Sequence, residues 1–155
     1  MKRFVVLLVL VLAFDQGSKA WARTLPLGVP QPVVHGYFDW EYAQNPGAAF
    51  SSFIGGEGAR IALSAIAALA IGAIVYAAVR TRPEQRLKLA AYGMIAGGAL
   101  GNLVDRVRVG SVTDFVRWRI HDTRWPIFNV ADAALVVGVV LLFLSAWRER
   151  RMIEA

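Results

Sequence analysis

The chain has 155 residues, of which 57% are hydrophobic and 18% are charged, and its net charge is +6. Soluble domains average about 45–50% apolar and about 25% charged residues, so this is not the composition of an ordinary soluble domain. With no cysteine and two histidines, disulfides, thiolate nucleophiles and cysteine-containing zinc sites are excluded. We expect one domain, residues 1–155, with no metal and no cofactor.

The first apolar stretch, about residues 4–22, has two interpretations. It could be a signal peptide, because basic residues precede it and Ala20-Trp21-Ala22 resembles a cleavage site. Asp15 and Lys19, however, are spaced i, i+4 and can pair on one helix face, which lets a helix continue to about residue 21. We therefore expect a transmembrane helix here.

The segment of about residues 23–59 follows the first helix and carries a weak strand signal. Residues 33–42 mix β-branched and aromatic side chains with partial alternation, which predicts a short sheet on the membrane surface. The alternative is a belt of interfacial aromatic side chains without a sheet.

Three further stretches predict transmembrane helices at about residues 60–79, 87–107 and 127–147. Residues 61–79 carry no charge and are long enough to cross a hydrocarbon core of about 30 Å. In the third helix, Gly93, Gly97 and Gly101 form a small-xxx-small ladder that predicts close packing on another helix.

Basic residues set the predicted orientation, since Lys and Arg are concentrated in residues 1–3, 80–88 and 148–155. We place these stretches in the cytoplasm, and the longer segments of about 23–59 and 108–126 outside. The predicted fold is an all-α membrane protein with four transmembrane helices, a small β-rich surface segment and a short helix or loop on the outer side. No basic run is interleaved with aromatics, so no nucleic-acid partner is expected.

Five polar clusters fall at the outer membrane boundary under this topology, where an ionisable side chain indicates a functional site. They are Asp15-Gln16-Gly17-Ser18-Lys19, Asn45-Pro46-Gly47-Ala48-Ala49-Phe50, Gly101-Asn102-Leu103-Val104-Asp105-Arg106, Val112-Thr113-Asp114-Phe115 and Phe128-Asn129-Val130-Ala131-Asp132.

The carboxylates divide by their expected partners. Asp15 can pair with Lys19, and Asp105 with Arg106 or Lys19, so a structural ion pair is expected for both acids. Asp114 and Asp132 have no cation at helical spacing and are candidates for a closely spaced pair that shares a proton. Such a pair could hydrolyse an amide or form a proton path through a transporter, and spacing alone does not decide between them.

The five clusters, in this order and at these intervals, resemble the conserved boxes of the lipoprotein signal peptidase (signal peptidase II) family, aspartyl proteases of bacterial membranes. The resemblance implies removal of the signal peptide from a prolipoprotein, on the amino side of a diacylglyceryl cysteine. It further implies a multi-pass protein of the bacterial cytoplasmic (inner) membrane, with cytoplasmic termini and a site near the periplasmic face.

The resemblance also assigns residues. Asp114 and Asp132 correspond to the catalytic pair of the family. The positions expected to shape or support the site are Asp15, Lys19, Asn45, Gly47, Asn102, Asp105, Arg106 and Asn129. A globomycin-type inhibitor is expected to block the aspartates, membrane lipid is the other expected partner, and a monomer is expected. The remaining hypotheses are a proton-coupled transporter and a non-catalytic membrane assembly factor.

Overall fold

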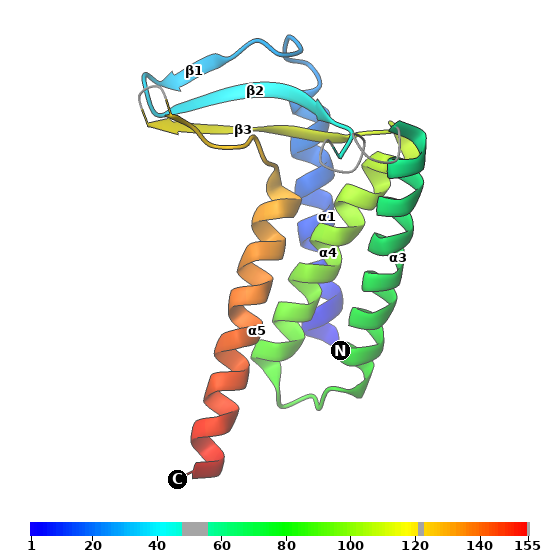
Figure 1. Cartoon of the computed structure of the whole chain (residues 1–155). Coiled ribbons are helices and arrows are strands. Elements are labelled where there is room, and N and C mark those ends of the chain that lie inside the picture. Colours follow the sequence, from blue (N-terminus) through cyan, green and yellow to red (C-terminus); the bar gives the residue numbers. More distant parts are fainter. Residues whose placement is uncertain (48–55, 121–122, 155) are drawn as a thin grey trace.

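The computed structural model describes residues 1–47, 56–120 and 123–154. In this part of the chain, four long helices run side by side and a small sheet lies across one end of the bundle (Figure 1). The helices are α1 (Lys2–Ala22), α3 (Gly56–Arg80), α4 (Arg86–Arg108) and α5 (Val130–Glu154). Each is long and apolar enough to cross a membrane, which confirms the four predicted spans. Both ends of the chain lie away from the sheet (Figure 1).

Helix α4 is the centre of the bundle and packs against the other three helices. Its glycine ladder faces α1, as predicted: a Cβ atom on Gly93 would lie 2.6 Å from the carbonyl oxygen of Phe4, and one on Gly97 would lie 2.9 Å from the Cβ of Val11. Both distances are too short for a side chain, so the two backbones can approach only because these positions are glycine.

The sheet is antiparallel, with strand order β1-β2-β3-β4. Its strands are β1 (Gln31–Val34), β2 (Phe38–Asn45), β3 (Val112–Ile120) and the short β4 (Thr123–Arg124). Within the stretch 33–42, where a strand was predicted, the chain forms a hairpin whose turn contains Gly36 at a φ of +84°. Glycine adopts this left-handed conformation without steric cost, and the turn therefore interrupts the predicted strand.

The expectation of a short helix or loop on the side of the sheet is wrong for residues 112–120, which form β3. Strand β3 pairs with β2, and its first four residues, 112–115, are all buried, so the strand is covered on both faces at its start. Residues 48–55 and 121–122, which also belong to the predicted outer segments, lie outside the described residues.

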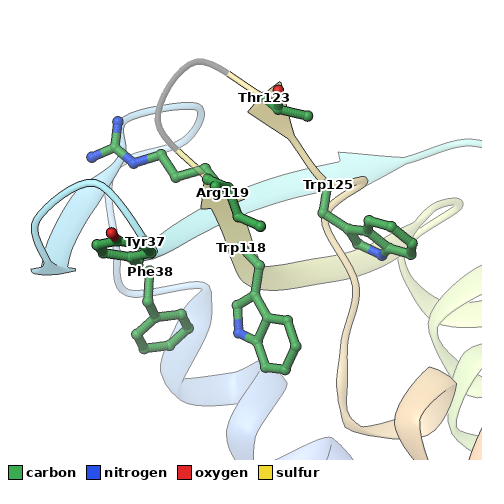
Figure 2. Close-up of a pocket in the computed structure, with 7 residues that line it drawn as sticks. Tyr37, Phe38, Trp118, Arg119, Thr123 and Trp125 are labelled. Carbon is green, nitrogen blue, oxygen red and sulfur yellow. The ribbon is translucent and has the colours of Figure 1, made fainter.

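The two faces of the β2–β3 pair have different chemistry. Trp118 lies opposite Phe38, and both side chains point from the sheet toward the helices (Figure 2). Arg117 and Arg119 alternate with Trp118 and therefore belong to the other face. There they pair across the strands, Arg117 with Glu41 at 2.7 Å and Arg119 with Asp39 at 3.1 Å. An aromatic face toward the helices and an ionic face away from them suit a sheet that lies on a membrane surface.

Helix α5 begins at Val130 rather than at about residue 127. Phe128, two residues before α5 begins, pairs with the sheet, because its backbone exchanges two hydrogen bonds with Val116 of β3 (3.1 and 2.8 Å). The first turn of α5 is thereby fixed directly beneath the start of β3.

Candidate active site

Asp114 lies near the start of β3 and is 3% exposed. Two amides donate to its carboxylate, Asn45 Nδ2 to Oδ2 at 3.0 Å and Asn129 Nδ2 to Oδ1 at 2.6 Å. Burial, and then the nearby charge of Asp132, raise the pKa of Asp114 from 3.8 to about 6, against the opposite effect of the two amides. The side chain is therefore able to hold or release a proton close to neutral pH.

Asp132 lies in the first turn of α5 and forms a capping box with Asn129. The backbone N–H of Asn129 donates to Asp132 Oδ2 at 3.2 Å, and the N–H of Asp132 donates to Asn129 Oδ1 at 3.0 Å. This reciprocal arrangement satisfies two free N–H groups at the helix start and fixes the rotamer of Asp132. Its other oxygen accepts a hydrogen bond of 2.8 Å from Asn102 Nδ2.

Asn129 and Asn102 join the two aspartates into one network. Asn129 contacts both carboxylates and also donates to Asn102 Oδ1 at 3.1 Å. Neither Asp114 nor Asp132 forms an ion pair with any described residue, which is what the spacing predicted. The two carboxylates are therefore linked to each other through Asn129.

A separate ionic cluster lies below this network, between α1 and α4. Lys19 is 0% exposed, and its Nζ lies 2.9 Å from Asp15 Oδ2 and 3.5 Å from Asp105 Oδ2. The same ammonium donates to Asn102 Oδ1 at 2.9 Å. Asp15 in turn accepts a 2.9 Å hydrogen bond from the backbone N–H of Ala131, which ties α1 to the start of α5. The predicted Asp15–Lys19 pair is thus present, and it connects to the aspartates through Asn102.

Two partners were predicted for Asp105, Lys19 and Arg106. Lys19 does lie beside it, whereas no Asp105–Arg106 ion pair is present among the described residues. Asp105 instead takes its closest cation from Arg23, at 2.8 Å. Arg106 points elsewhere: its Nη1 reaches the carbonyl oxygen of Asn102 at 3.5 Å. The Nε of Arg106 is buried without a hydrogen-bond partner in the described chain.

Three residues of this network were not predicted: Gln16, Arg23 and Thr113. Arg23, the C-cap of α1, follows Lys19 by four residues and bridges Asp105 to the hydroxyl of Thr113, and Gln16 donates to the carboxylates of Asp15 and Asp105. The i, i+4 spacing from Lys19 to Arg23 was the available signal. It was missed because a helix ending near residue 21 leaves Arg23 in a loop.

Asn45 and Gly47 form a turn beside Asp114. The N–H of Gly47, at a φ of +84°, donates to Asn45 Oδ1 at 2.9 Å and so aims the amide nitrogen of Asn45 at Asp114. A side chain on Gly47 would collide with Leu63 of α3 as well as being strained. The remainder of this box, residues 48–50, lies outside the described residues.

All ten predicted site residues therefore gather where the sheet meets the helices, nine of them linked by hydrogen bonds or ion pairs and Arg106 through its contact with Asn102. Among the described residues, no group of three His, Cys, Asp or Glu side chains could hold a metal ion.

An apolar hollow of about 470 Å³ opens beside Asp132, with Trp118, Trp125 and Phe128 on its walls. A second hollow of about 350 Å³ continues from the two tryptophans toward Tyr37 and Phe38 under the end of the sheet (Figure 2). One carboxylate of the pair thus borders a largely apolar space that faces outward from α5.

The profile of the family described as signal peptidase (SPase) II matches residues 7–148 of the chain. The chain belongs to the signal peptidase II family. It is 42% identical over 151 residues to the lipoprotein signal peptidase of Geobacter metallireducens, covering 96% of this chain and 92% of that protein. Its identity to the lipoprotein signal peptidase of Xylella fastidiosa is 37% over 139 residues, covering 88% and 83% of the two chains.

A solved structure supports the same assignment at the level of the fold. A bacterial membrane enzyme determined by the in meso method at 1.9 Å resolution superimposes with a TM-score of 0.84 at 29% identity, covering 94% of this chain and 93% of the other. The predicted family is confirmed. The present chain is a multi-pass membrane protein of a peptidase family.

Proposed function

We propose that this protein removes the signal peptide from diacylglyceryl-modified prolipoproteins, cutting on the amino side of the lipidated cysteine with water activated by Asp114 and Asp132. The curated relatives are named lipoprotein signal peptidases, which supports the substrate class. The observation that carries the catalytic assignment is the network in which Asn129 contacts two carboxylates that form no ion pair with a described residue.

The pair works as a general base and a general acid. The ionised carboxylate takes a proton from water as the water oxygen bonds to the scissile carbonyl carbon, and the protonated carboxyl gives its proton to the carbonyl oxygen. The resulting diol collapses when its hydroxyl proton returns to the second aspartate and the first aspartate protonates the cysteine nitrogen. The C–N bond then breaks, the products are a carboxylic acid and an amine, and the pair again holds one proton.

Neighbouring residues support this chemistry. Asn129 and Asn102 hold the two carboxylates in fixed rotamers, and Asn45 donates to Asp114 from the other side. The partnerless Nε of Arg106 is suited to a carbonyl oxygen of the bound peptide. The lysine cluster of Asp15, Lys19 and Asp105 joins α1 to α4 and contacts the network of the pair through Asn102 and through the backbone of Ala131 and Thr113.

The apolar hollow beside Asp132 suits a substrate that stays in the membrane. Acyl chains on the cysteine can remain against Trp118 and Trp125, or in lipid, while the peptide bond reaches the polar network. The sheet end then faces the periplasm and both termini the cytoplasm, which agrees with the arginines at the opposite end. The ten residues assigned to the site all come from one chain, which supports a monomer, and a globomycin-type inhibitor would occupy the same space.

The test is cleavage of a synthetic lipidated precursor peptide by purified protein in lipid nanodiscs. Wild-type protein is expected to cleave the diacylglyceryl peptide and to leave the unlipidated peptide intact. Asp114→Asn and Asp132→Asn should each lose activity by at least about three orders of magnitude, because each removes one proton-transfer group. Turnover by either variant at the wild-type rate would disprove the assignment.

A matched control distinguishes the loss of a proton-transfer group from the loss of a negative charge in general. Glu84→Gln removes a carboxylate from the exposed connection between α3 and α4, far from the sheet, and should leave both activity and thermal stability unchanged. Both aspartate variants should retain a cooperative thermal transition, since asparagine has the shape of aspartate and its one carbonyl oxygen still accepts one of the two hydrogen bonds at either position.

A further inference from the structure

The end of the bundle away from the sheet carries a polar hollow of about 580 Å³. Its lining comes from the start of α1, the connection to α4 with the start of that helix, and the last third of α5, all at the end of the molecule away from the sheet (Figure 1). Three arginines from these three segments line it: Arg3, Arg86 and Arg148. This hollow shares no residue with the aspartate network.

The three arginine side chains have no ion-pair or hydrogen-bond partner among the described residues. Glu149, a half-buried carboxylate on the lining, is already engaged: Lys88 lies 3.6 Å away, and Gln85 and Ser145 donate to it at 2.9 and 3.3 Å. Glu84 is the other carboxylate on the lining, so three free guanidinium groups outnumber the acids and leave the hollow positive.

Two cation–π contacts locate this end relative to a membrane. The guanidinium of Arg80 stands 5.3 Å from the ring centroid of Tyr76, and that of Arg151 stands 4.4 Å from the ring of Trp147. Aromatic rings and arginines that meet at the end of an apolar helix occupy the headgroup layer of a bilayer. Because Trp147 and Arg148 are adjacent on α5, the hollow lies at headgroup depth.

We propose that this hollow binds the phosphate headgroup of an anionic phospholipid of the surrounding leaflet. Guanidinium groups donate paired hydrogen bonds to phosphate oxygens, and basic pockets between transmembrane helices bind anionic lipid headgroups. Leu87 and Ala90 provide an apolar wall for the glycerol and the first acyl carbons, which a free phosphate would not use. The bound lipid links α1, α4 and α5 at the end opposite to the peptidase site.

The experiment uses the full chain in nanodiscs of phosphatidylcholine with a minor fraction of phosphatidylglycerol, and native mass spectrometry of the lipid retained after release. Wild-type protein is expected to retain phosphatidylglycerol preferentially. A charge-assisted hydrogen bond is worth about ten-fold in affinity, so Arg3→Gln/Arg86→Gln/Arg148→Gln, which removes all three donors to the phosphate, should lose the preference by at least about 100-fold. Arg148→Gln alone, which keeps two of the arginines, should lose about ten-fold.

The matched control removes the same charge from the same end: Lys2→Gln/Arg82→Gln/Arg150→Gln, three residues that do not line the hollow. It should retain the preference, and an equal loss in both triple variants would overturn the proposal in favour of diffuse attraction. Glycerol 3-phosphate added to protein in pure phosphatidylcholine separates lipid from free phosphate. Thermal stabilisation equal to that by phosphatidylglycerol would overturn the lipid assignment, and none is expected.

Discussion

The side-chain amide of Asn129 donates a 2.6 Å hydrogen bond to Asp114, while its carbonyl oxygen and backbone N–H complete a capping box with Asp132. Asn129 therefore has two separable roles: it caps helix α5, and it sets the relative position of the two proposed catalytic carboxylates. The capping function needs only a short acceptor at the N-cap, whereas the positioning function needs the amide donor.

This difference predicts opposite effects of two substitutions. Asn129→Ser keeps a hydroxyl that can cap α5, so its thermal midpoint should stay close to that of the wild type, but kcat should fall by about 100-fold because the donor to Asp114 is gone. Asn129→Ala should lose the same activity and in addition about 1 kcal/mol of stability. Activity measurements on the lipidated peptide and thermal scans of both proteins check this, and full activity of Asn129→Ser would show that the amide has no catalytic role.

The raised pKa of Asp114 predicts that the stability of the protein depends on pH. The unfolded side chain titrates at 3.8 and the folded one at about 6, so the folded state binds its proton more tightly. The stabilisation is complete below about pH 4 and is lost as the pH rises through about 6, at a cost of about 2–3 kcal/mol. Thermal midpoints from pH 4 to pH 7 should fall for wild-type protein relative to Asp114→Asn, and parallel curves would contradict the assignment.

The buried lysine cluster predicts a coupling between Asp15 and Lys19. Both side chains are 0% exposed and lie 2.9 Å apart, so either single variant, Asp15→Asn or Lys19→Met, leaves a buried charge with less compensation and should cost about 3–5 kcal/mol. The double variant should cost less than the sum, which a double-mutant cycle of unfolding in mixed micelles measures.

Activity distinguishes this structural role from a chemical one. The folded fraction of Asp15→Asn should retain kcat within about ten-fold, because Asp15 contacts Lys19, Gln16 and the backbone of Ala131 and neither of the two unpaired aspartates. A well-folded but inactive Asp15→Asn protein would show that the acid takes part in the reaction.

Hydropathy predicted the four helices because each contains a mostly apolar stretch long enough to cross a bilayer, and this pattern is local in the sequence. The unpaired state of Asp114 and Asp132 was also a local inference, from the absence of cations at helical spacing. Both predictions required only the neighbours of each residue along the chain.

The sheet register could not be predicted in this way. Pairing of β2 with β3 shifts between Trp40 and Ala43, so Asp114 comes opposite Ala43 and not the residue that regular pairing from Phe38 and Trp118 would give. Likewise Arg23 reaches Asp105 across 82 residues of sequence. Such contacts depend on how α1, α4 and the sheet pack, and neither spacing nor composition contains that information.

Close packing of α1 on α4 beneath the site gives a final prediction about Gly101. A Cβ atom there would overlap the carboxylate of Asp15, which is held by Lys19 and by the backbone of Ala131 and cannot move aside. Gly101→Ala should therefore destabilise the protein by about 1–3 kcal/mol.

Gly72 of α3 is the matched control, since a Cβ atom there has no atom within 4 Å. Gly72→Ala should be neutral or slightly stabilising, because alanine is the better helix former. Thermal midpoints of the two variants in the same detergent test this. Equal midpoints would mean that α1 can move away from α4 at the level of Asp15, and then the lysine cluster could not hold Asn102 against Asp132.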